Sequence, residues 1–391
     1  MTKVQPGLEV LVSSPCRWLS NLRLGLLCNA ASTDAKFNHA RFLIADRFPG
    51  QLKALFSPQH GFFGEKQDNM VESDHMMDPD LNIPIYSLYG KTRIPTKQMF
   101  DSIDVLLVDL QDVGTRVYTF IYTVSYCMEA AKKFRKRILI LDRPNPIGGT
   151  QVEGNCLSPQ QASFVGRFPI PMRHGLTIGE LSVLFNETFG IGCDLQVIPM
   201  NGWNRKMYYQ DTGLPWIPPS PNLPTPTSAT VYPGQVLWEA TNVSEGRGTT
   251  QPFEIFGAPF FDTGLIIEAL GGRQLTGAVL RPIAFEPTSN KWQARLCHGF
   301  QIHITELYRF KPYVTSLKLL RIIRFLFPQA FQWKSPPYEY EYKRLPIDLI
   351  LGDSTIRRRI ERFDEIEEIE KSWTGQLEDF IKLSQRFYLY K

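Results

Sequence analysis

Glutamates in glycine-containing loops are the side chains of this 391-residue sequence best suited to chemistry. Glu65 and Glu153 lie in such loops, and Glu239 and Glu245 lie in later loops. Hydrolysis of a glycosidic bond generally uses one carboxylic acid that protonates the leaving oxygen and one carboxylate that acts as base or nucleophile. A solvated loop position is the simpler interpretation of each glutamate taken singly.

Histidine and arginine residues supply further polar candidates. His60 is suited to orient a carboxylate or to bind a substrate hydroxyl, and a structural histidine is an equally good interpretation. Arg116, Arg143 and Arg247 are candidates to hold an anionic substrate through paired hydrogen bonds. The alternative for Arg143 is an ion pair with Asp142 or with Asp109, the aspartates that end two predicted strands.

Short apolar runs alternate with helical patterns in the N-terminal half, which predicts an α/β fold with a Rossmann-like parallel sheet and helices on both faces. Thr177 with Glu180 has the spacing of a helix capping box. The predicted strands span 22–28, 52–56, 105–110, 138–141 and 195–199, and the predicted helices span 34–48, 118–134 and 177–188.

Ligands of an open parallel sheet bind outside the carboxyl ends of its strands. The segments after the predicted strands are rich in polar side chains, so we expect a site at this edge. Asp109 and Asp142 have a second interpretation, as caps of the turns that follow. The polar residues are Gln59 and His60 after the second strand, Asp112, Arg116 and Tyr118 after the third, and Arg143, Asn145 and Glu153 after the fourth.

Several familiar motifs are absent from the sequence. No GxGxxG follows the first strand, Ile85 stands where a P-loop ending at Thr92 needs its first glycine, and neither HExxH nor GxSxG occurs. The six cysteines form no CxxC pair, so we expect no metal framework and a cytoplasmic protein, with the periplasm as the alternative.

The amino-acid composition and the predicted elements change towards the C-terminus. Residues 216–233 are dense in proline, so we expect no helix or central strand there, and either a linker or the wall of a pocket. Strands are predicted within 281–304, a helix at 317–327 and charged helices at 354–391. We therefore predict a catalytic domain at 1–250 and a smaller α+β domain at 251–391 that completes a cleft.

Charge and hydropathy exclude two classes of partner. The 43 Lys and Arg exceed the 39 Asp and Glu by four, too few for an electrostatic case for nucleic acid. No apolar stretch approaches the roughly 18 residues of a membrane span. The apolar run at 24–28 is also too short for the core of a signal peptide.

An ordered set of motifs resembles those of the exo-acting β-N-acetylmuramidases, and the resemblance runs from about residue 20 to the C-terminus. The resemblance implies a Rossmann-like domain packed on a smaller one, a site in the cleft between them, and no metal or redox cofactor. It also implies release of N-acetylmuramic acid from the non-reducing end of peptidoglycan-derived glycans. The motifs are SPQHGFFGEKQDN, IYSLYGKTR, DVLLVDLQDVGTRVYTF, LDRPNPIGG, FPIPMRHGLTIGEL and ATNVSEGRGTTQPFEIFGAP.

Two positions depart from the family pattern. Many members carry Pro-Glu-His-Gly where this chain has Gln59, and an amide neither ionises nor usefully donates a proton. Glu65 is the acid in the same loop that we expect to replace it. Members also tend to carry an aspartate where Glu153 stands, a change that keeps the carboxylate.

The resemblance leads to a hypothesis for the site. Glu65 is the general acid, Glu153 the second carboxylate, and Arg116 or Arg143 holds the lactyl carboxylate of a muramyl sugar. Two alternatives remain: a muramyl-sugar or muropeptide binding protein without hydrolysis, and a metal-dependent hydrolase that uses His60, Asp109 and Asp112. The other predicted substrate-binding residues are Gln59, Tyr118, Asp142, Asn145, Asn222, Glu239, Asn242, Glu245 and Arg247.

Overall fold

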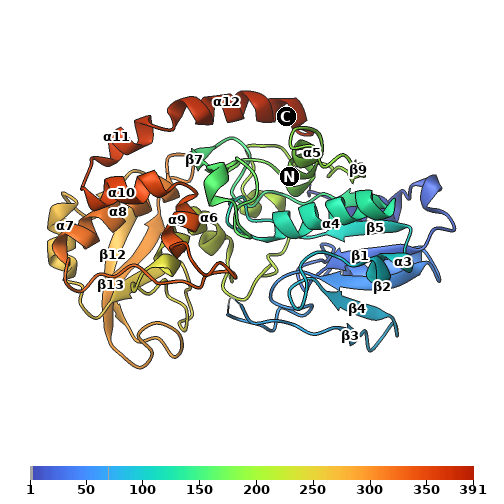
Figure 1. The fold of residues 1–391 in the computed structure, drawn as a ribbon, viewed down its shortest axis with the longest axis horizontal. Coiled ribbons are helices and arrows are strands. Elements are labelled where there is room, and N and C mark those ends of the chain that lie inside the picture. The colour runs from blue at the N-terminus through green and yellow to red at the C-terminus, as the bar shows by residue number, and fades with distance from the viewer. Residues whose placement is uncertain (1–2, 69) are drawn as a thin grey trace.

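A seven-stranded sheet forms the N-terminal half of the molecule in the computed structural model, which describes residues 3–68 and 70–391 (Figure 1). Every neighbouring pair is parallel except β3 with β4. Without the short edge strand β3, the strands follow the doubly wound order 3-2-1-4-5-6, as the predicted Rossmann-like fold requires. The spatial order is β3 (Met76–Met77), β4 (Pro84–Ser87), β2 (Leu52–Ser57), β1 (Leu24–Cys28), β5 (Val105–Asp109), β6 (Arg137–Leu141) and β9 (Asp194–Ile198).

Helices cover both faces of this sheet because its central strands are apolar on both faces. Leu24 and Leu26 of β1 pack with α1 (Gly7–Ser13) and α2 (Ala40–Arg47), whereas Leu27 points to the opposite apolar cluster. Side chains alternate across a strand, so a fully buried strand needs cover on each side. The second face is covered by α3 (Lys97–Asp101), α4 (Phe120–Phe134) and α5 (Ile178–Glu187).

The predicted capping box at the start of α5 is confirmed, since Thr177 accepts a hydrogen bond from the Glu180 amide and Glu180 accepts one from the Thr177 amide. The helix predicted at 34–48 starts later, at Ala40. Residues 34–39 form a turn in which Asp34 accepts the amides of Lys36 and Asn38.

The proline-dense segment was predicted to lack a helix, and this is wrong for α6 (Pro226–Gln235). Pro226 occupies the first turn, where a missing amide hydrogen breaks no bond, and the Thr225 side chain accepts the Ser228 amide as N-cap. Pro233 falls in the last turn. Residues 216–225 do remain irregular, and Asn29 donates a hydrogen bond to the Pro219 carbonyl, which ties them to the sheet.

A four-stranded antiparallel sheet and helices form the C-terminal half, as predicted. Helix α8 packs on α6, and the hairpin β7 (Glu153–Cys156) with β8 (Pro171–Arg173) lies between the halves (Figure 1). The remaining elements are β10 (Ile255–Ala258), α7 (Thr263–Ala269), β11 (Gln274–Leu275), β12 (Ala278–Phe285), β13 (Cys297–Ile304), α8 (Pro312–Leu326), α9 (Pro346–Leu351), α10 (Ser354–Glu361), α11 (Ile366–Lys371) and α12 (Thr374–Ser384).

The last helices run back from the C-terminal half to the N-terminal half (Figure 1). There the Tyr390 hydroxyl donates a hydrogen bond of 2.6 Å to Asp142, just after β6, and the Leu389 amide donates to Glu180 of α5. The end of the chain is thus anchored on the first domain.

Candidate active site

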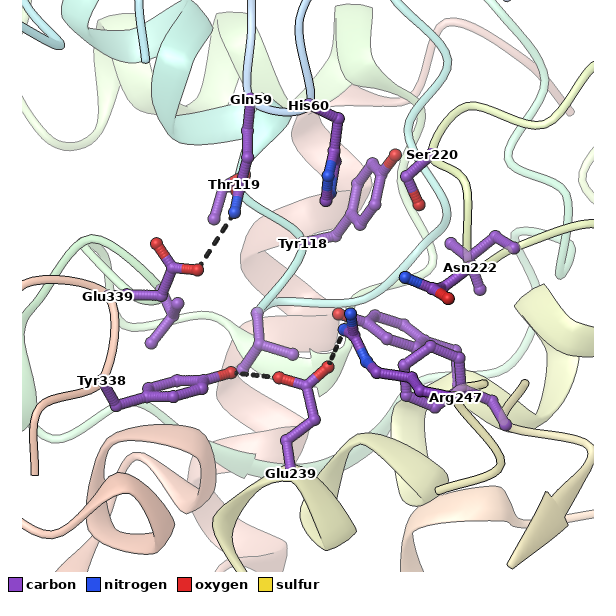
Figure 2. A pocket seen from close by; sticks show the side chains of 15 residues that line it. Gln59, His60, Tyr118, Thr119, Ser220, Asn222, Glu239, Arg247, Tyr338 and Glu339 are labelled. Carbon is purple, nitrogen blue, oxygen red and sulfur yellow. Dashed lines mark hydrogen bonds and ion pairs between the residues drawn. The ribbon is translucent and has the colours of Figure 1, made fainter. Parts of the chain in front are cut away.

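A buried pocket lies where the loops after β2 and β5 meet the C-terminal half (Figure 2). The space between its walls, counted together with the mouth that opens to solvent, is about 430 Å³. Its lining residues come from both halves of the chain: Gln59, His60, Val117, Tyr118, Thr119, Val165, Ser220, Asn222, Leu223, Tyr232, Glu239, Arg247, Phe253, Tyr338 and Glu339.

Glu239 is the first of two carboxyl groups in the pocket. It lies on the short helix η4 (Val236–Ala240), accepts a hydrogen bond of 2.6 Å from Arg247, and accepts another of 2.7 Å from the Tyr338 hydroxyl (Figure 2). Burial favours the neutral acid, but the Arg247 charge and these hydrogen bonds outweigh it and lower the pKa of Glu239. Glu239 is therefore ionised at neutral pH.

Glu339 is the second carboxyl group, and its environment acts in the opposite direction. Its oxygens accept hydrogen bonds from the Gln59 amide (3.0 Å) and the Tyr89 hydroxyl (2.6 Å). Burial raises the pKa of Glu339, these two hydrogen bonds oppose the rise, and the negative charge of Glu239 adds to it. Two carboxyl groups whose pKa values are pushed apart are the arrangement that acid and base roles require.

The backbone of the pocket is strained at three residues that are not glycine. His60, Phe253 and Glu339 have φ angles of 76°, 64° and 46°, in the left-handed region that L-residues rarely adopt, and Tyr340 continues it at 66°. Each such residue costs free energy, and such residues cluster at functional sites. Three such residues therefore lie in the wall of the pocket, although others occur in turns elsewhere in the chain.

His60 presents a hydrogen-bond acceptor. Its Nδ1 lies 2.7 Å from the Lys66 carbonyl, so Nδ1 carries the proton and Nε2 keeps its lone pair. Burial lowers the pKa of His60 to about 4, so the ring is neutral at physiological pH. Such a ring can accept a hydrogen bond from a sugar hydroxyl.

Aromatic rings form another wall. Tyr232 meets Phe253 edge to face at 4.9 Å between ring centroids, and Tyr118 meets Tyr232 at 6.2 Å. Faces of this kind can pack against the apolar side of a sugar ring, while the neighbouring Asn222 amide offers polar atoms. The pocket thus combines polar and apolar contacts suited to a carbohydrate.

Of the predicted site residues, the structure gathers Gln59, His60, Tyr118, Asn222, Glu239 and Arg247 in this pocket. Glu245 lies beside them, 3.2 Å from Arg247 and 2.7 Å from Lys291. It lines an adjoining cavity of about 560 Å³ together with Asp68, Glu239, Arg247, Asn290, Lys291 and Lys334.

The predicted catalytic pair, Glu65 and Glu153, is not among the lining residues. Glu65 is exposed and folds back over Gly61 of its own loop, where it accepts the Phe63 amide. Glu153 is buried and accepts the Val314 amide in the first turn of α8, and burial raises the pKa of Glu153 to about 7. These contacts within the protein account for the position of each of the two side chains without a bound substrate.

The two arginines expected to hold the lactyl carboxylate are used elsewhere. Arg143 pairs with Asp109 at 2.5 Å, which confirms the alternative interpretation. Arg116 is fully buried, and its guanidinium donates to the backbone carbonyls of Asn155, Ile170, Ile350 and Leu351. Arg247 is the arginine on the pocket wall.

Four other candidates hold the backbone or neighbouring side chains. Because their polar atoms are used in turns and anchors, their placement supports structural roles. The contacts join Asp112 with Gly114, Asp142 with Thr177, Gly179 and Tyr390, Asn145 with Ile147 and Leu176, and Asn242 with Ala330 and Gln332.

The metal-site alternative fails on placement. Asp109 is paired with Arg143, and His60 bonds the Lys66 carbonyl. Within residues 3–68 and 70–391, no three His, Cys, Asp or Glu side chains are grouped so as to hold a metal ion.

Sequence reasoning missed Glu339 and its partners Tyr89 and Thr119. The signal that was available is the run PPYEYEY at 336–342, where acidic residues alternate with tyrosines after two prolines. Its link to the loop after β2 is a tertiary contact between residues 280 positions apart.

The doubly wound domain meets a second domain around a pocket that holds two carboxyl groups, the kind of group that most glycoside hydrolases use. The family models of the exo-β-N-acetylmuramidase NamZ match residues 24–227 with its N-terminal part and 230–390 with its C-terminal part. The chain belongs to this family. The predicted boundary near residue 250 stays a prediction.

Several known proteins are similar along the whole chain. The peptidoglycan β-N-acetylmuramidase NamZ of Bacillus subtilis (strain 168) is 42% identical over 388 residues, which cover 99% of this chain and 92% of that protein. The crystal structure of a DUF1343 family protein from Bacteroides fragilis has a TM-score of 0.89 at 34% identity, with both chains fully covered. A second from the same organism has a TM-score of 0.77 at 29% identity, covering 100% of this chain and 99% of the other.

Membrane insertion of a helix finds no support in the described residues. None of their helices combines the length and the apolar character that a transmembrane span requires.

Proposed function

We propose that this protein releases N-acetylmuramic acid from the non-reducing end of peptidoglycan-derived glycans, with Glu239 and Glu339 as its two catalytic carboxyl groups. The observation that carries the assignment is their opposite environments in one pocket. The substrate is a small glycan or muropeptide, in keeping with the activity named for the Bacillus subtilis relative. The cytoplasmic location stays a prediction.

We assign the general acid role to Glu339, because its burial and the nearby Glu239 charge favour the protonated form. As the bond between the anomeric carbon and the glycosidic oxygen breaks, the Glu339 proton passes to that oxygen, which leaves as a hydroxyl. Glu239, already ionised, acts on the anomeric carbon as nucleophile or through a water that it deprotonates. Water supplies the hydroxyl of the released sugar and a proton that restores the acid.

Arg247 is the cation that we place at the lactyl carboxylate. It is the arginine that lines the pocket, and among the described residues its Nη1 makes one hydrogen bond, a long one of 3.3 Å to the Gln67 carbonyl. A substrate carboxylate at Nη1 would replace this contact by a shorter, charge-assisted one. His60 and Asn222 are placed to bind hydroxyl and acetamido groups.

The test uses para-nitrophenyl β-N-acetylmuramide beside the corresponding glucosaminide. We expect release from the muramide, and a fall in turnover of at least about a hundredfold for both Glu339→Gln and Glu239→Gln. Glu65→Gln is the matched control, since this carboxylate is exposed in the loop that carries Gln59. Near-normal turnover of either pocket variant removes that residue from its role, and no release from either substrate by the unaltered protein favours a binding function.

A further inference from the structure

Gln59 occupies a position that no catalytic step above explains. It is 3% exposed, follows β2, and lies between two other parts of the chain. Its amide oxygen accepts a hydrogen bond of 2.6 Å from the Thr119 hydroxyl, and its amide nitrogen lies 3.0 Å from Glu339 (Figure 2).

The Thr119 side chain bonds to Gln59 and not to the backbone of α4, the helix that it precedes. It stands at the N-cap position of α4, where a threonine side chain usually accepts a backbone amide. Here the side chain makes no such cap, and its hydroxyl donates to Gln59 instead. Because a hydroxyl that donates needs an acceptor, this bond turns the amide oxygen towards Thr119 and the NH2 group towards Glu339.

An amide NH2 group has a definite chemical preference for its neighbour. It only donates hydrogen bonds, so it stabilises the Glu339 carboxylate and gives nothing comparable to the neutral acid. Tyr89 donates to the other oxygen of Glu339 at 2.6 Å. In the part of the chain that the structure describes, Gln59 and Tyr89 are the two side chains that donate to Glu339.

Other charged and titratable groups around Glu339 act in both directions. Glu239 disfavours the carboxylate, whereas Arg93, whose guanidinium stacks 3.7 Å from the centre of the Tyr340 ring, favours it. The neutral titratable groups near these carboxyls include His60, Tyr232 and Tyr338, the last of which is bonded to Glu239.

We propose that Gln59, held in orientation by Thr119, is a positioning residue that stabilises the carboxylate left on Glu339 after its proton has gone to the leaving oxygen. The inference rests on the acid role of Glu339 given under Proposed function. The amide differs from a carboxyl group at the same position because it has no proton to exchange, whereas a carboxyl 3 Å away would titrate together with Glu339 as a pair.

The pH dependence of kcat/KM on the chromogenic muramide tests this assignment. Turnover is lost on the alkaline side when Glu339 loses its proton, and removal of a donor raises the pKa of Glu339. In Gln59→Leu we therefore expect this limb to move up by about one pH unit and the maximal rate to fall by about tenfold, because the acid becomes weaker. Gln59→Glu moves the limb further and spreads it, since two adjacent carboxyls titrate as a pair.

Thr119→Val is the matched variant. It keeps Gln59 and almost the same volume but frees the amide to rotate, so we expect a smaller shift in the same direction. A slower Gln59→Leu enzyme whose alkaline limb stays where it was would overturn the proposal, because loss of packing alone lowers the rate without moving a pKa. If Gln59→Leu does not fold, an unmoved limb in Thr119→Val has the same meaning.

A second readout separates this proposal from the proposed function. Carbon-13 NMR titration of the glutamate carboxyls, with Glu339→Gln to assign the signal, follows the protonation of Glu339 without any turnover. A pKa that is higher in Gln59→Leu than in the unaltered protein supports the positioning role even if the muramide is not cleaved. An unchanged pKa rejects it even if the enzyme is active.

Discussion

At the scale of single residues, each pocket carboxyl is held by side chains from distant parts of the chain. Glu239 meets Arg247 and Tyr338, and Glu339 meets Gln59 and Tyr89. Such contacts influence which carboxyl carries the proton, because hydrogen-bond donors and positive charges stabilise the ionised form of the carboxyl that they contact. The chemistry therefore depends on groups that themselves do not react.

Arg247 allows this dependence to be tested. Its Nη2 donates to Glu239 while its Nε lies 3.2 Å from Glu245, a geometry that one ammonium group cannot reproduce. In Arg247→Lys we expect a higher pKa for Glu239, so the acidic limb of the pH–rate profile moves to higher pH and activity at low pH falls. Lys334→Arg, at an exposed cation of the adjoining cavity, is the control. An acidic limb that Arg247→Lys leaves in place contradicts the prediction.

The limits of sequence reasoning are visible at these same residues. His60 is predicted because it follows a strand, Glu239 because it is a carboxylate in a later loop, and Arg247 because an arginine can hold an anionic substrate. Glu65, a carboxylate in a loop after a strand, is predicted on the same grounds and yet folds over its own loop. Glu339 was missed because its place in the pocket depends on how the second domain docks, which local patterns do not encode.

At the scale of secondary structure elements, apolar runs located the strands well because β1 and β5 are buried on both faces. The rule that proline excludes helices failed at α6, where Pro226 and Pro233 sit at the two ends. What α6 gains is close packing: a side chain on Gly234 would collide with the Pro312 carbonyl at the start of α8. The packing of α6 against α8 thus outweighs the low helix propensity of its prolines.

Glu153 of β7 connects this strand to helix α8. Its carboxylate caps α8, and burial raises the pKa of Glu153 from its usual 4.5 to about 7. Since the folded form then binds a proton more tightly than the unfolded chain, this group's contribution is full below about pH 4.5 and is lost as the pH rises through about 7. Glu153→Gln cannot ionise, so we expect it to be more stable than the unaltered protein at pH 8, by on the order of 1–3 kcal/mol, and similar at pH 5.

Urea unfolding at the two pH values measures this difference. Because Glu153 lies outside the pocket, turnover of the muramide is expected to stay near normal in the same variant. A stability difference that does not change between pH 5 and pH 8 would show that the carboxyl is not neutral in the folded protein.

At the scale of the whole molecule, one apolar core joins the two halves, so we expect them to unfold together. A single buried apolar cluster extends from Leu27 and Phe56 of the first sheet to Phe300 of the second. Fully buried Arg116 also joins the halves, since it bonds carbonyls at Asn155 and Ile350. The pocket lies at this junction, so its geometry persists only while the halves stay docked.

The anchored C-terminus offers a test of whether the two halves unfold together. The Tyr390 hydroxyl donates to Asp142 and accepts the Met200 amide at 2.9 Å, far from the pocket. Tyr390→Phe removes both bonds inside a buried cluster, so we expect a loss of about 1–3 kcal/mol. If the halves unfold together, calorimetry shows one transition at a lower Tm, whereas Leu389→Ala, at an exposed neighbour, changes Tm little. Two separate transitions in Tyr390→Phe would contradict this expectation, because one half would then unfold while the other keeps its fold, and the pocket at their junction would be lost in the first transition.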